Sequence, residues 1–176
     1  MSDKALPRLT DINLSTNPIT DWSYVLVLSS LLPNLKILAL NECLLSSIEF
    51  PEEDTLSKNR SFESSTRWFP SLTSLQISSC KIDNWTSVEA LNTLSNLSHL
   101  KFKLNPILYN ESQETCRQLI IASINSLKFL NGSFIEKQER RGAEIDFLKK
   151  YGKQYLTVQA SNDSIEMEKF SKEHPR

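Results

Sequence analysis

One pattern of apolar residues recurs four times along this chain, and it constrains the fold more than any other feature. Its clearest copy is LSHLKFKLNPI at residues 97–107, which follows the frame Leu-x-x-Leu-x-Leu-x-x-Asn-x-Leu. Leu100 and Phe102 are two residues apart, so on a short strand they point to one face. Asn105 is expected to be buried where the chain turns away from the strand, because its amide can satisfy backbone groups there.

The other three copies begin at Leu9, Leu35 and Leu72. Their remaining members are Ile12, Leu14, Asn17 and Ile19, then Leu38, Leu40, Cys43 and Leu45, then Leu75, Ile77, Cys80 and Ile82. Such spacing is typical of leucine-rich repeats. We therefore predict an α/β leucine-rich repeat solenoid. Its short parallel sheet, with strands at 11–15, 37–41, 74–78 and 99–103, lies on the concave side, with helices and loops on the convex side.

The repeats divide the chain into three parts. Residues 1–131 form the array, with a polar insertion at 50–68 that we interpret as a solvated loop. Residues 132–157 form a helical C-terminal cap, and residues 158–176 a polar tail. Beyond Leu130 the frame breaks down at Asn131-Gly132, a turn signal. The N-terminal edge lacks a comparable cap, which indicates further repeats upstream or a partner that covers it.

Helical spacing and capping residues predict the helices. The first helix follows Thr20 or Asp21, the second follows Asp83 or Thr86, and the third starts near Ser112. Their buried positions are Trp22, Val25, Leu26, Ser29 and Leu32, then Val88, Leu91 and Leu94, then Cys116, Leu119, Ile120, Ser123 and Ile124. The cap helix, from about Glu136, carries an apolar stripe of Ala143, Phe147, Leu148, Tyr151 and Tyr155.

Little in the sequence could support catalysis. The two histidines have no cysteine or carboxylate cluster at metal-ligand spacing, and an odd count of three cysteines disfavours a disulfide framework. Only 3 glycines occur, with no phosphate-binding loop among them. The net charge of −1 gives no drive toward nucleic acid or anionic membranes. No signal peptide or membrane-spanning run is evident. We expect no enzyme, cofactor or metal.

The residues between the frame leucines offer a binding surface instead. On the strands they face away from the leucines, toward the concave side of the solenoid, and we call this surface the outer sheet face. The candidate partner-binding residues on it are Asn41, Ser74, Gln76, Ser78, His99, Lys101 and Lys103. This face is polar and neutral in the early repeats and basic in the fourth.

From Phe69 to Tyr155 the chain resembles the tubulin-binding cofactor E family. The motifs that carry the resemblance are FPSLTSLQISSCKIDNW, LKFKLNPI, CRQLIIASINSLKFLNG and ERRGAEIDFLKKYG, and the last two are the more specific. Members of this family usually also carry a CAP-Gly domain and a ubiquitin-like domain, neither of which has a counterpart here.

The resemblance implies a cytoplasmic, cytoskeleton-associated chaperone. It would bind α-tubulin and, with other tubulin-folding cofactors, take part in assembling and dismantling the α/β-tubulin heterodimer. The alternative is a leucine-rich repeat scaffold for a non-tubulin partner, such as a cofactor E-like, motor or ribonucleoprotein subunit.

Overall fold

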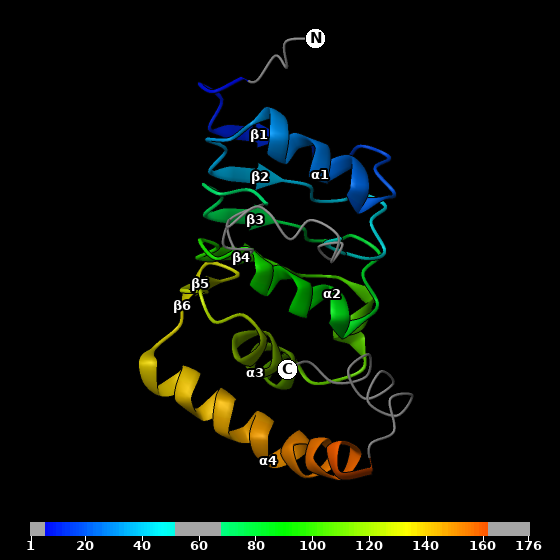
Figure 1. Ribbon diagram of the computed structural model, residues 1–176, viewed down its shortest axis with the longest axis vertical. Helices are drawn as coiled ribbons and strands as arrows, with labels where there is room; N and C mark the ends of the chain where they lie inside the picture. The colour runs from blue at the N-terminus through cyan, green and yellow to red at the C-terminus, as the bar shows by residue number, and fades with distance from the viewer. Residues whose placement is uncertain (1–5, 52–67, 162–176) are drawn as a thin grey trace, which may run out of the picture.

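The computed structural model describes residues 6–51 and 68–161 (Figure 1). Its strands form one six-stranded sheet, whose spatial order β1-β2-β3-β4-β5-β6 is also the sequence order. They are β1 (Asp11–Asn13), β2 (Ile37–Ala39), β3 (Ser74–Gln76), β4 (His99–Lys101), β5 (Phe129–Leu130) and β6 (Ser133–Phe134). The first five are parallel, and β6 runs antiparallel to β5. The predicted leucine-rich repeat fold is confirmed.

The helices are α1 (Trp22–Leu31), α2 (Trp85–Ala90), α3 (Gln113–Ser123) and α4 (Lys137–Ser161), with short 3₁₀ turns η2 (Leu91–Thr93) and η3 (Pro106–Tyr109). Helices α1, α2 and α3 lie to one side of the sheet, and α4 runs across the end of the array (Figure 1). Asp21 and Ser112 cap α1 and α3 as predicted. The prediction for α2 was wrong: its cap is Asn84, whose side chain accepts the Ser87 N–H at 2.9 Å. Among the described residues, no helix has the length and apolar character needed to cross a membrane.

Each of the first four strands begins where the sequence predicts but is only three residues long. Leu38, Leu75 and Leu100 lie in register across β2, β3 and β4, and each is at most 2% exposed. Backbone bonding continues past the strand ends, since the Leu14 N–H donates to the Ala39 carbonyl at 2.8 Å. The repeats therefore stack through a longer ladder than the strands alone indicate.

The Asn and Cys positions of the frame join each repeat to the one before it. Each side chain donates to the backbone carbonyl of the third frame residue of the preceding repeat, which directly follows the strand of that repeat. The pairs are Cys43 to Leu14 at 3.4 Å, Cys80 to Leu40 at 3.3 Å, Asn105 to Ile77 at 2.9 Å and Asn131 to Phe102 at 3.4 Å. Asn105 is fully buried, as predicted. At Cys43 and Cys80 a thiol, which is a weaker hydrogen-bond donor, thus replaces the asparagine amide.

The array contains a fifth strand that the sequence analysis did not assign. Phe129 and Leu130 pair in parallel with His99 and Leu100, and Asn131 fills the Asn role described above. Gly132 then takes a φ of +87°, which suits glycine, and the chain reverses into β6. The predicted turn at Asn131-Gly132 is confirmed, and it directly follows the strand of this shortened fifth repeat.

The helix α4 packs along α3. Ala143 and Tyr151 are 1% and 8% exposed, and Phe147 is half-buried. Leu148 was wrongly placed in the buried stripe, because it is 66% exposed. Ala143, Phe147 and Tyr151 are spaced by four residues and form one line along the helix. Leu148 lies a further 100° around the helix axis. Helix α4 continues to Ser161, past the predicted start of the polar tail. Residues 162–176 lie outside the described part of the chain.

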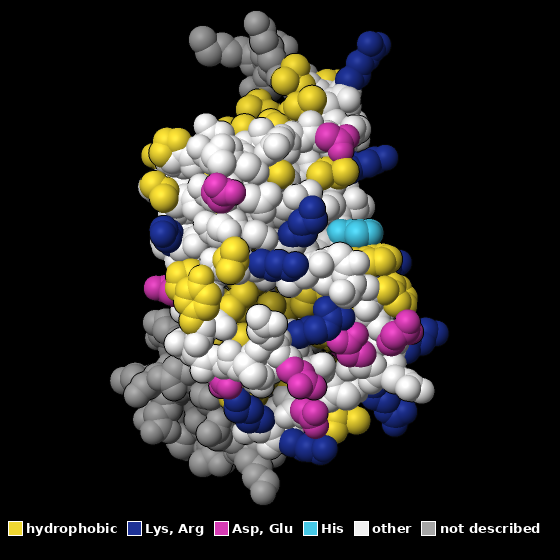
Figure 2. All heavy atoms as spheres, turned by 180° about the vertical axis from the view of Figure 1, so that it is seen from behind, with side chains coloured by type: hydrophobic (Ala, Val, Ile, Leu, Met, Phe, Trp, Pro, Cys, Tyr) yellow, Lys and Arg dark blue, Asp and Glu magenta, His cyan; other side chains and the backbone are white. Residues whose placement is uncertain are grey.

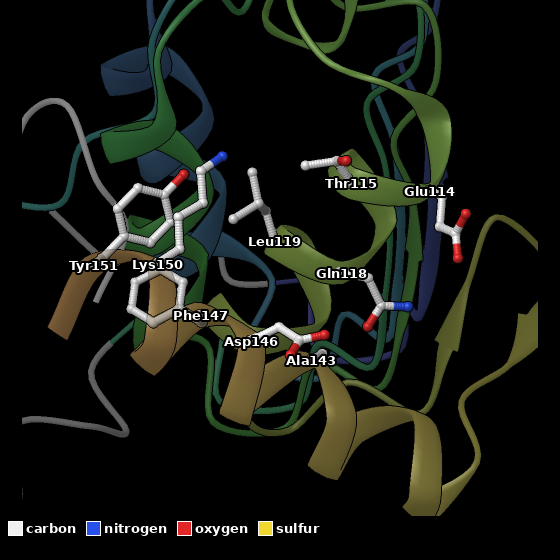
Figure 3. A pocket seen from close by; sticks show the side chains of 9 residues that line it. All are labelled: Glu114, Thr115, Gln118, Leu119, Ala143, Asp146, Phe147, Lys150 and Tyr151. Carbon is white, nitrogen blue, oxygen red and sulfur yellow. The ribbon is translucent and has the colours of Figure 1, made fainter.

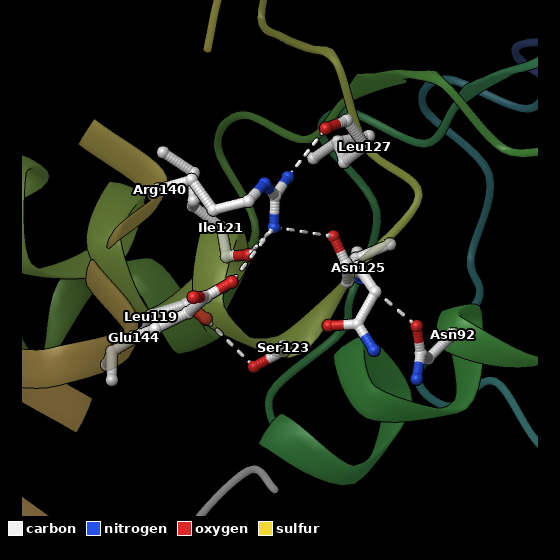
Figure 4. A network of polar contacts seen from close by, with 9 residues as sticks. Asn92, Leu119, Ile121, Ser123, Asn125, Leu127, Arg140 and Glu144 are labelled. Carbon is white, nitrogen blue, oxygen red and sulfur yellow. Dashed lines mark hydrogen bonds and ion pairs between the residues drawn. The ribbon is translucent and has the colours of Figure 1, made fainter. Parts of the chain in front are cut away.

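Two arginines hold α4 against the end of the array, and Figure 4 shows the contacts of one of them, Arg140. The Arg140 guanidinium donates to the carbonyls of Ile121, Ile124 and Leu127 at 2.8, 3.3 and 2.6 Å, where α3 ends and the fifth repeat begins. Arg117, on α3, pairs with Glu139 at 2.6 Å. This hydrogen bond is the main reason that the pKa of Glu139 is lowered. The motif ERRG therefore has a structural role in closing the array.

The insertion at 50–68 is not wholly a solvated loop. Phe50 and Trp68, at its two ends, are partly buried against the core. The Phe50 ring lies 5.9 Å from Trp22 and 6.4 Å from Trp68, measured between ring centroids. These rings fix both ends of the insertion on the helix side of the array. Residues 52–67, the remainder of that prediction, lie outside the described residues.

Candidate functional site

The strand register brings the predicted partner-binding residues into rows across the outer sheet face. Ser74 lies beside His99, and Gln76 lies beside Lys101. Rows of this kind form because parallel strands in register place equivalent side chains next to each other. The fold therefore brings these residues, which come from different repeats, onto one surface.

Asn41 and Ser78 also have a structural role that the sequence did not indicate. The Asn41 side-chain oxygen accepts the Ser78 N–H at 3.0 Å, and the Ser78 hydroxyl oxygen accepts the Lys103 N–H at 3.2 Å. The Ser15 hydroxyl oxygen accepts the Asn41 N–H in the same way, at 3.1 Å. These bonds prolong the ladder beyond the strand ends, so both side chains are already used within the molecule.

His99, Lys101 and Lys103 are the exposed members of the set, while Ser74 and Gln76 are half-buried. The two lysines carry their charge on the fourth repeat, and the exposed Lys128 adds a third cation just before β5. Asp11, an exposed acid, lies on β1 at the opposite end of the sheet. The predicted gradient from a neutral to a basic surface therefore follows the strand order.

The structure adds two aromatic residues that sequence reasoning missed. The His99 and Phe129 rings are stacked, with centroids 4.5 Å apart and planes inclined by 7°. Phe134, on β6, meets Phe129 edge-on at 5.2 Å. We call His99, Phe129 and Phe134 the aromatic shelf. Two phenylalanines flanking Asn131-Gly132 could have indicated it, because a hairpin turn places such residues side by side.

Two of the hollows in the described part of the chain border α3. One, of about 260 Å³, separates α3 from α4; Glu114, Gln118 and Asp146 point toward it (Figure 3). The other, of about 600 Å³, lies between η3 and α3 and has an apolar floor (Figure 2). Its lining includes Phe102, Leu108, Cys116 and Ile120.

The described residues offer no reactive centre. No group of three or more His, Cys, Asp or Glu side chains among them could hold a metal ion. Burial raises the pKa of the Cys80 thiol to about 11, and burial, followed by the charge of Glu111, raises that of Cys116. Both thiols are therefore protonated near neutral pH and poor nucleophiles.

Comparison with known structures identifies the fold of the chain, and comparison with known sequences identifies its relatives. In fold it is a leucine-rich repeat protein. A chain of the SNF/U2A′ complex from Drosophila melanogaster shares its architecture at a TM-score of 0.57 and 18% identity, covering 84% of this chain and 86% of that one. No protein-family model matches the sequence.

In sequence the chain is related to tubulin-specific chaperone E, which confirms the resemblance to the tubulin-binding cofactor E family. The Xenopus laevis protein of that name is 36% identical over 97% of this chain, and the Rattus norvegicus protein is 38% identical over 86%. Tubulin-folding cofactor E of Arabidopsis thaliana is 33% identical over 84%. The chain spans only 27% to 32% of the length of these relatives.

Proposed function

We propose that this chain is a tubulin-binding region of a tubulin-folding cofactor, and that it binds α-tubulin through the outer sheet face. The observation that carries the proposal is the sequence relationship to proteins named for tubulin folding, in animals and in a plant, over most of the chain. In this role it takes part with other cofactors in assembling and dismantling the α/β-tubulin heterodimer in the cytoplasm. It acts by binding, not by catalysis.

The surface chemistry supports this role for the outer sheet face. Tubulin is an acidic protein, and Lys101 and Lys103 are exposed on the fourth repeat beside His99. Opposite charges on two partners speed their encounter and set their orientation more than they add affinity. Salt screens exposed charges beyond about 10 Å at 0.1 M, so the benefit should decline as salt is added.

Binding kinetics with purified tubulin test the proposal. The double variant Lys101→Glu/Lys103→Glu should associate on the order of tenfold more slowly than the wild type at low salt, with a smaller difference at high salt. The matched control is Lys81→Glu/Lys137→Glu, which changes the net charge equally at exposed positions outside the strands. It should have little effect.

Two results would contradict the proposal in different ways. If the sheet-face variant associates as fast as the wild type at low salt, tubulin does not bind on this face. If the wild-type chain does not bind tubulin at all, the chain is a scaffold for another partner.

A further inference from the structure

The aromatic shelf exposes apolar surface outside the described hydrophobic core. Phe134 is 51% exposed, and neither Phe129 nor Phe134 is part of the described hydrophobic core. The neighbouring Leu100 and Leu130 point to the core instead and are 2% and 1% exposed. Alternation along β4 and β5 thus places the leucines inside and the shelf outside. Exposed aromatic clusters of this kind are common at the energetic centres of protein interfaces.

Exposed lysines lie close to the shelf in the sequence. Lys101 follows His99 by two residues on β4, and Lys128 directly precedes Phe129 on β5. Lys103 continues the same side of the fourth repeat, and all three lysines are exposed. An occupant of this surface is therefore best matched by an acidic segment, whose carboxylates would lie over the lysines.

We infer that the aromatic shelf is a docking site for an acidic protein segment that contributes one aromatic side chain. That side chain would pack against Phe129 and Phe134, where offset and edge-on ring contacts are favourable. Neighbouring carboxylates would face Lys101, Lys103 and Lys128. The inference rests on the proposed function for the identity of the partner, and it places the anchor of the interface at the C-terminal end of the sheet.

Single-stranded nucleic acid is the competing class of ligand, because bases also stack on aromatic residues among cations. The net charge of −1 and pI of about 6.2 disfavour a polyanionic ligand, since its binding depends on accumulated positive charge. A protein segment needs only a local match, as the three lysines provide. We therefore argue for the acidic peptide, with nucleic acid as an outcome of the test.

The test is a two-dimensional NMR titration of the full chain with the peptide Glu-Glu-Glu-Phe-Glu-Glu. Signals of residues 99–103 and 128–134 should shift. The same peptide with Ala in place of Phe should bind several-fold more weakly. Phe134→Ala should weaken binding of the Phe peptide about tenfold, and His99→Ala provides a second variant that perturbs the shelf. The matched control is Tyr24→Ala on α1, because Tyr24 is 68% exposed and lies outside the sheet.

Several outcomes would overturn the inference. These are the absence of shifts around the shelf, equal binding of the Phe and Ala peptides, or binding unchanged in both shelf variants. Binding of a uridine hexanucleotide at the shelf in place of the peptide would also overturn it.

Tubulin binding separates this inference from the proposed function. If wild type and Phe134→Ala bind tubulin equally, the proposed function stands and the shelf is not its anchor. If the peptide binds the shelf while the wild-type chain fails to bind tubulin, the inference stands and the proposed function fails.

Discussion

The two ends of the described repeat array are covered to different extents. Leu9 and Leu127 fill the same frame position in the first and fifth repeats, but they are 37% and 2% exposed. At the C-terminal end the β5–β6 hairpin and α4 cover the last repeat, and Arg140 binds the exposed carbonyls there. At the N-terminal end β1 is an edge strand, and Leu6 beside it is 56% exposed.

The difference shows how little of the burial comes from the frame itself. A leucine at a given frame position is buried only when a neighbouring repeat or a cap covers it on each side along the stack. In the first repeat, Ile12 and Leu14 are therefore only half-buried, although they match the frame as well as Leu38 and Leu40, which are fully buried. Stability should accordingly be concentrated toward the covered end, and the following predictions test this.

Removal of α4 should have the largest effect. A chain ending at Ile135 loses Ala143, Tyr151 and Arg140 together, which uncovers the apolar side of α3. We expect loss of cooperative unfolding and aggregation on size-exclusion chromatography. A chain ending at Ser161, which keeps α4, is the control. A monomeric Ile135 truncation with an unchanged urea midpoint would show that α4 is not a cap.

Leu127→Ala should come next. The side chain is 2% exposed in the last repeat, and removing a buried leucine costs about 2–5 kcal/mol in free energy of unfolding. Urea denaturation measures the loss. A loss below about 1 kcal/mol would mean that the structure relaxes around the cavity. The C-terminal end would then not be packed more tightly than the N-terminal end.

Arg140→Ala should destabilise the C-terminal end by about 1.5–3 kcal/mol, the range for hydrogen bonds to a charged group. Its guanidinium donates hydrogen bonds to three carbonyls at the end of α3, and these carbonyls would lose their donor. The exposed neighbour Arg141 provides the matched control, because Arg141→Ala should change stability by less than about 0.5 kcal/mol. Equal losses for the two variants would show that the carbonyl contacts do not stabilise the cap.

Sequence reasoning succeeded where the signal is periodic and failed where it depends on spatial proximity. The frame predicts Leu75 and Leu100 as buried neighbours because each repeat copies the last one. No local pattern links Arg140 to Leu127, since their contact requires the position of α4 to be known. The aromatic shelf was missed for a related reason: Phe129 and Phe134 meet only because Asn131-Gly132 folds as a hairpin.

The ion pair between Arg117 and Glu139 predicts a pH dependence confined to the covered end. Because the pKa of Glu139 is lowered in the folded state, mainly by its hydrogen bond to Arg117, the folded state favours the carboxylate. This contribution is fully present above the ordinary pKa of 4.5 and is lost as the pH falls through the lowered value. Urea midpoints measured below that pH should fall more steeply for the wild type than for Glu139→Gln. Parallel curves would assign no stabilising role to the pair.

Leu9→Ala should have the smallest effect, below about 1 kcal/mol. The side chain is already 37% exposed, so its truncation removes less buried area than the same change at Leu127 and leaves an open notch that water can fill. The urea midpoint of Leu9→Ala, compared with that of Leu127→Ala, is therefore the sharpest measure of the asymmetry between the two ends. If both variants lose the same stability, the N-terminal edge is covered in solution. A dependence of the Leu9→Ala loss on protein concentration would then show that a second copy of the chain provides the cover.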